Sequence, residues 1–167
     1  LCENGIPVDP FGIDFEAANP NDIIEAMGKR ARKWRKDAEF YSVTINGMKT
    51  DGTLDFSTDK AIITVEYFSP ELVGSRDSSK RQDSIRKYNI NKYNLEEEVW
   101  GVKKAFPAVP GTPVPKCQLS KVGKLLKGKG MTDKSQATIT RDPGFAFATD
   151  GLSFNVNVAE PTLHLFL

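Results

Sequence analysis

The fold of this 167-residue chain is decided by residues 21–70, NDIIEAMGKRARKWRKDAEFYSVTINGMKTDGTLDFSTDKAIITVEYFSP. The first part has apolar residues at helical spacing, which predicts a helix over residues 21–36 with Asn21 as its N-cap. Two runs rich in alternating or β-branched residues follow the helix. They predict strands over residues 39–46 and 61–69.

A shorter copy of this pattern lies near the C-terminus, over residues 118–158. It opens with a Lys-rich helical segment, and strands are expected over residues 137–141 and 152–158. A helix followed by antiparallel strands, twice over, predicts an α+β fold made of two helix-plus-antiparallel-strand halves packed as one small domain. The predicted core includes Trp34, Ile63, Val65, Leu126 and Phe154.

Prolines and charged runs divide the chain into segments. The first residues carry five large apolar side chains at near-alternate positions, and a later run has four prolines within eleven residues, which is typical of a stiff connector. The predicted segments are an extended N-terminal arm (1–20), a first helix-plus-sheet half (21–106) with a basic insertion (71–94), a proline-rich connector (107–116) and a second half (117–167).

Pairing within the first half follows from its turns. The Asn46-Gly47 and Asp51-Gly52 dipeptides are typical of tight turns between strands. The segment after the basic insertion, residues 95–106, is expected to pair with the strand at 61–68. Its acidic run, residues 96–98, is interpreted as a solvated loop.

Charge is distributed unevenly, although the net charge is only +1. Six bases and no acid occupy residues 28–36, and residues 76–92 carry six bases against two acids, with tyrosines among them. Such segments are solvated faces of a packed fold, or they bind an anionic partner such as nucleic acid or acidic lipid. The candidate residues for an anionic-partner surface are Arg30, Lys33, Arg76, Arg81, Arg86 and Lys87.

The two cysteines, Cys2 and Cys117, are a candidate disulfide that would tie down the N-terminal arm. The alternative is two free thiols, as in a cytoplasmic protein. The disulfide favours a periplasmic or secreted protein, and the absence of an Asn-x-Ser/Thr sequon favours a bacterial envelope. No run approaches the ~20 apolar residues that a transmembrane helix needs.

Motifs that carry chemistry are missing from the sequence. His164 is the single histidine, no Gly-x-Ser-x-Gly elbow is present, and two cysteines with one histidine fall short of a structural zinc site. Residues 123–130 approach a phosphate-binding loop, but Gly130 stands where Ser or Thr is needed. We therefore predict no catalytic residue, no metal and no cofactor.

The order of elements resembles PepSY-type and cystatin-like small domains of the bacterial envelope. The resemblance covers roughly residues 21–68 and 118–158, and it is carried by Ala31-x-x-Trp34-x-x-Asp37-Ala38 and by the two Gly-containing turns of the first half. It implies a non-catalytic domain that binds another protein. The second hypothesis is a module for an anionic partner, and an enzyme is the third.

Overall fold

The computed structural model describes residues 2–3, 6–7, 12–106, 119–128, 136–141, 152–157 and 162–166. Its helices are α1 (Pro20–Trp34), α2 (Pro70–Val73), α3 (Ser78–Arg81) and α4 (Leu119–Gly128). Its strands are β1 (Cys2–Glu3), β2 (Ile6–Pro7), β3 (Glu39–Met48), β4 (Ile62–Phe68), β5 (Ile85–Ile90), β6 (Asn94–Trp100), β7 (Gln136–Arg141), β8 (Leu152–Asn157) and β9 (Thr162–Phe166).

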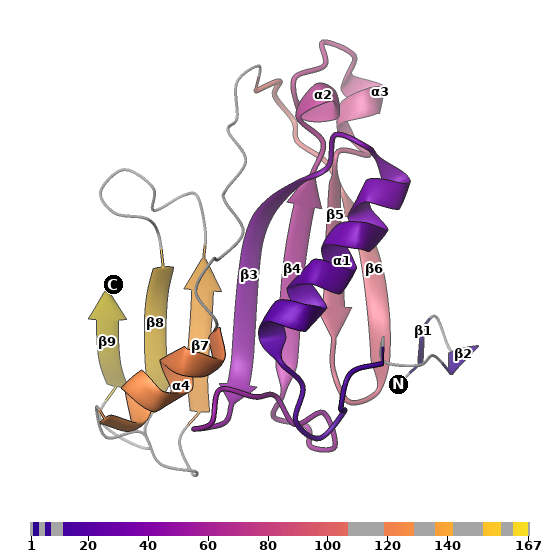
Figure 1. The fold of residues 1–167 in the computed structure, drawn as a ribbon. Coiled ribbons are helices and arrows are strands. Elements are labelled where there is room, and N and C mark those ends of the chain that lie inside the picture. Colours follow the sequence, from indigo (N-terminus) through magenta and orange to yellow (C-terminus); the bar gives the residue numbers. More distant parts are fainter. Residues whose placement is uncertain are drawn as a thin grey trace.

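These strands form one sheet in the order β2-β1-β6-β5-β4-β3-β7-β8-β9 (Figure 1). Neighbouring strands are antiparallel except β1 and β6, which are parallel. The two predicted halves meet where β3 of the first pairs with β7 of the second. The predicted α+β fold is confirmed.

The N-cap of helix α1 lies two residues before the predicted one. Asn19, not Asn21, is the N-cap, and its side-chain oxygen accepts a hydrogen bond from the Asn21 N–H at 3.0 Å. Pro20 occupies the first turn, where its missing N–H costs nothing. The prediction of Asn21 was wrong because two Asn residues flank the proline and both suit a cap.

The core lies between α1 and one face of the sheet. The apolar stripe of the helix is buried against alternate residues of β3, β4 and β5, and Ile63 and Val65 are fully buried as predicted. Trp34 was wrongly expected inside, since it is only partly buried at the edge of the core. The side chains of Leu126 and Phe154 lie outside the described residues.

The predicted basic insertion contains the two short helices and β5. Tyr88 and Ile90 of β5 are buried, and the strand pairs with β4 on one side and β6 on the other. The predicted pairing of residues 95–106 with the 61–68 strand was therefore wrong, because β5 lies between them. The acidic run 96–98 is part of β6 and not a loop.

The two Gly-containing dipeptides have different roles. Gly52 has φ +82° in a turn, as predicted. Asn46-Gly47 was wrongly expected to be a turn, since both residues lie within β3. A Cβ on Gly47 would lie 2.1 Å from the carbonyl oxygen of Lys60, so only glycine fits where β3 approaches that loop.

The described parts of the N-terminal arm lie at the sheet and the core. Strand β1 adds to the start of β6, with Cys2 opposite Asn94. Ile13 and Phe15 pack against the core further along the arm. The proline-rich connector at residues 107–116 lies outside the described residues.

Candidate binding surfaces

The six cations proposed for an anionic partner do not form one surface. Arg30 and Arg86 both reach Glu97 on the α1 side of the sheet. Lys87 is adjacent to Arg86 in β5, so its side chain points to the opposite face. The remaining three residues lie on α1 and in the α2–α3 region, and they are Lys33, Arg76 and Arg81.

Arg86 lies in an ion cluster beneath the last turn of α1. It is 8% exposed; its Nη1 lies 2.6 Å from Asp83 Oδ1 and its Nε 3.2 Å from Glu97 Oε1. The second oxygen of Glu97 lies 3.2 Å from Arg30 Nε. The Arg86 guanidinium carbon lies 4.2 Å from the centre of the Trp34 ring. This cluster fastens α1 to β5 and β6, because each of its charges has a partner on another element.

Arg81 is also engaged within the fold. Its Nη1 donates to the carbonyl oxygens of Ser75 and Arg76 at 2.8 and 2.9 Å. Its Nη2 donates to the carbonyl oxygen of Lys103 at 3.1 Å. The guanidinium therefore holds α3 against the chain that follows β6. Lys33 and Arg76 are exposed.

A second network lies on the face of the sheet turned away from α1. Within the part of the chain that the structure describes, α1 lies on one face of β3–β6, and no helix is seen over the middle of the opposite face (Figure 1). At the end of this opposite face next to α2, Phe68 is buried. Thr64 of β4 donates to Asn89 Oδ1 of β5 at 2.8 Å, and the Asn89 amide donates to Glu98 of β6. Ser42 of β3 donates to Glu66 of β4 at 2.8 Å. Polar side chains are thus oriented in two sets, one joining β3 to β4 and one running across β4, β5 and β6.

Trp100 ends this network at the edge of the sheet. The indole is 53% exposed, and its Nε1 donates to Glu98 Oε2 at 2.9 Å. Lys87 lies with its Nζ 5.4 Å from the centre of the ring and 4.0 Å from Glu98. These contacts fix the orientation of a large exposed aromatic side chain. We name the polar part of this surface the open face, with the half-buried residues Ser42, Thr64, Glu66, Lys87, Asn89 and Glu98 and the exposed Trp100.

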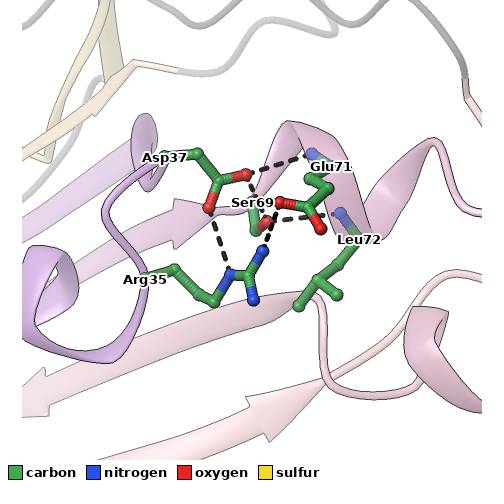
Figure 2. A network of polar contacts seen from close by, with 5 residues as sticks. All are labelled: Arg35, Asp37, Ser69, Glu71 and Leu72. Atoms are coloured by element: carbon green, nitrogen blue, oxygen red, sulfur yellow. Dashed lines mark hydrogen bonds and ion pairs between the residues drawn. The ribbon is translucent and has the colours of Figure 1, made fainter.

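A third polar network joins the end of α1 to the start of α2 (Figure 2). Asp37 accepts hydrogen bonds from the Ser69 hydroxyl at 2.6 Å and the Glu71 N–H at 3.1 Å. Arg35 Nε lies 3.2 Å from Asp37, and its Nη2 lies 2.5 Å from Glu71. Burial raises the pKa of Asp37, but these hydrogen bonds outweigh it and hold the pKa below its usual value. The network caps α2 and closes the loop after α1, so its role is structural.

The described residues contain no group of three His, Cys, Asp or Glu side chains that could hold a metal ion. No helix among them is long and apolar enough to span a membrane. His164 lies in β9, with its side chain outside the described residues, and residues 123–128 of the phosphate-loop-like segment lie in α4. Cys117 also lies outside them, so its disulfide with Cys2 stays a prediction.

Comparison with known proteins gives no relative from which a function could be taken. No protein family, no curated protein and no solved structure matches the chain. The function must therefore be argued from the surfaces themselves.

Sequence reasoning missed both Glu97 and the open face. The signal for β6 was present in the alternation of Leu95, Glu97 and Val99, which share one side of the strand. Three consecutive acids hid this period, because strands are depleted in Glu. The partners of Glu97 come from α1 and β5, which are not its neighbours in the sequence.

Proposed function

We propose that this chain is a non-catalytic domain that binds another protein through the open face. The observation that carries the proposal is the exposed Trp100 joined to a row of mutually hydrogen-bonded polar side chains. Trp is among the residues that contribute most binding energy in protein interfaces. Side chains already held in place lose less conformational entropy when a partner binds.

The comparison with the cationic alternative supports this choice. Four of the six candidate cations, Arg30, Arg81, Arg86 and Lys87, contact groups of the same chain. Binding to phosphates depends on cations that can exchange their counterions for the ligand. Cations that already hold acidic side chains or carbonyl oxygens gain less from such a ligand.

Site-specific photocrosslinking in the source cells tests the proposal. A benzoylphenylalanine at position 100 replaces one aromatic side chain by another on the open face. The same residue at position 33, an exposed site on α1, is the matched control. We expect one protein adduct that forms from position 100 and not from position 33. Equal crosslinking from both positions, or adducts from neither, would contradict the proposal.

We also propose that the protein is a periplasmic or secreted domain of the bacterial envelope. The support is the resemblance in element order and the pair of cysteines, one of which, Cys2, lies in β1 between β2 and β6. Alkylation of the native protein without reductant, followed by mass spectrometry, tests this. Two unlabelled cysteines that become labelled after reduction are expected, whereas labelling of both Cys2 and Cys117 beforehand would remove the disulfide and this reason for export.

A further inference from the structure

Among the residues that the structure describes, the outer edge of β6 has no strand partner over most of its length. The two-residue strand β1 pairs only with Asn94 and Leu95. Within the residues that the structure describes, no strand pairs with residues 96–100 on the side away from β5. An edge of this kind presents unpaired N–H and C=O groups that an added strand can use.

The alternation of hydrogen-bonded pairs in the β5–β6 ladder identifies which backbone N–H and C=O groups of β6 point away from β5. The Asn91 N–H donates to the Asn94 carbonyl at 3.1 Å, which makes these two residues a hydrogen-bonded pair in the register of the hairpin. Bonded and non-bonded pairs alternate in an antiparallel ladder. The peptide groups of Glu96 and Glu98 therefore face β5, and those of Glu97 and Val99 face away from it.

The side chains at this edge indicate which strand it accepts. Glu96 and Glu98 project on the open face, where Glu96 is exposed and Glu98 also contacts Lys87, 4.0 Å away. Glu97 projects on the α1 side, where Arg30 and Arg86 neutralise it. Residues of an added strand that lie opposite Glu96 and Glu98 project on the same face as these carboxylates. Val99, which is 55% exposed, offers apolar contact on the other face.

A second copy of this chain does not suit the edge in the registers that align the acidic runs of the two copies. Antiparallel pairing of two β6 strands about Glu97 would place Glu96 opposite Glu98 of the other copy and Glu97 opposite itself. Parallel pairing in register would place each acid opposite the same acid. Like charges directly opposite each other destabilise a strand pair.

We propose that the edge of β6 binds an extended segment of a partner protein as an added strand, with Lys or Arg at alternate positions opposite Glu96 and Glu98 and apolar residues between them. This inference rests on the proposed function and names the kind of partner and the mode of binding. The added strand would continue the sheet beyond β6, next to Trp100 of the open face.

The test uses the peptide acetyl-Lys-Val-Lys-Val-Lys-Val-Lys-amide and the purified full chain. We expect saturable binding by isothermal titration calorimetry, together with slower hydrogen exchange of the Glu97 and Val99 amides. The matching Glu-Val peptide should bind at least tenfold more weakly. Absence of binding, or binding that leaves both amides unprotected, overturns the proposal.

Val99→Pro is the matching protein variant, with Val99→Ala as its control. Proline removes an N–H that faces away from β5, so the β5–β6 ladder keeps its bonds. Peptide affinity should fall at least tenfold in Val99→Pro and less than threefold in Val99→Ala. Unchanged affinity in a folded Val99→Pro protein overturns the proposal; if that variant does not fold, amide exchange in the unmodified chain decides.

Different results would overturn the two proposals, protein binding through the open face and strand addition at β6. A crosslink from position 100 without peptide protection at β6 would leave the open-face function in place and remove strand addition. A concentration-dependent dimer that Val99→Pro abolishes would show a second copy on the edge and overturn the assigned partner.

Discussion

Tyr67 of β4 packs its hydroxyl directly over Gly28 of α1. The hydroxyl donates to the Ile24 carbonyl at 2.9 Å, and a Cβ on Gly28 would lie 2.8 Å from the hydroxyl oxygen. Burial raises the pKa of Tyr67 to about 12, so the group remains a donor across the ordinary pH range. The contact explains why a glycine occupies the middle of the helix.

This contact predicts coupling between the two positions. At a solvent-exposed position in the interior of a helix, Gly→Ala stabilises the protein by about 1 kcal/mol. We expect Gly28→Ala to lose that gain in the native background, because the new methyl group displaces the Tyr67 hydroxyl. In a Tyr67→Phe background the same change should stabilise the protein. Urea unfolding of the four proteins checks this, and additive effects would contradict the contact.

The two tryptophans should differ in their contribution to stability. Trp34 is partly buried against the core and lies over Arg86, whereas Trp100 is exposed. A fully buried tryptophan would cost ~3–5 kcal/mol on truncation to Ala, so we expect about 2 kcal/mol for Trp34→Ala. Trp100→Ala should cost less than about 0.5 kcal/mol. Denaturant unfolding measures both, and equal costs would show that Trp34 is not packed as described.

Glu97 and its neighbour Glu96 in β6 provide a test variant and a control variant for the ion cluster around Arg86. Glu97→Gln leaves the buried Arg86 guanidinium with Asp83 as its remaining carboxylate. We expect a cost of about 2 kcal/mol, since unpairing a buried charge is expensive. Glu96→Gln, at an exposed neighbour, should cost less than about 0.5 kcal/mol. Similar values for the two variants in urea unfolding would refute a stabilising cluster.

Acid should weaken the network around Asp37. The pKa of its carboxyl group is lower in the folded protein than in the unfolded chain, so its stabilising contribution is complete above the unfolded value of about 4. The contribution is lost as the pH falls through the folded pKa. The stability difference between the native protein and Asp37→Asn should therefore shrink as the pH falls from about 5 to 2. Unfolding at a series of pH values checks this, and a constant difference would contradict it.

Retention on heparin separates protein binding from binding to a polyanion. Because four of the six candidate cations have partners within the chain, we expect weak retention and a slope below about 2 in log affinity against log salt. The double variant Lys33→Glu, Arg76→Glu changes the two exposed candidates and should alter this retention little. A steep salt dependence that this double variant removes would favour the anionic-partner hypothesis.

Local pattern alone was sufficient for α1 and β4. Ile23, Ile24, Met27 and Ala31 recur at helical spacing, and all four are buried in the structure. The most apolar run of the first half became β4, in the centre of the sheet between β3 and β5. In these segments the side chains that define the pattern are the ones that fill the core.

Strand β5 and the binding surfaces required the tertiary structure. Arg86 occupies an inward-facing position in the alternating pattern of β5. A charge is tolerated at this position only because Glu97, Asp83 and Trp34 surround it. The open face likewise depends on Thr64, Asn89 and Glu98 from three strands meeting side by side. A sequence records which side chains are apolar, whereas the pairing of strands and the compensation of buried charge depend on residues far apart in the chain.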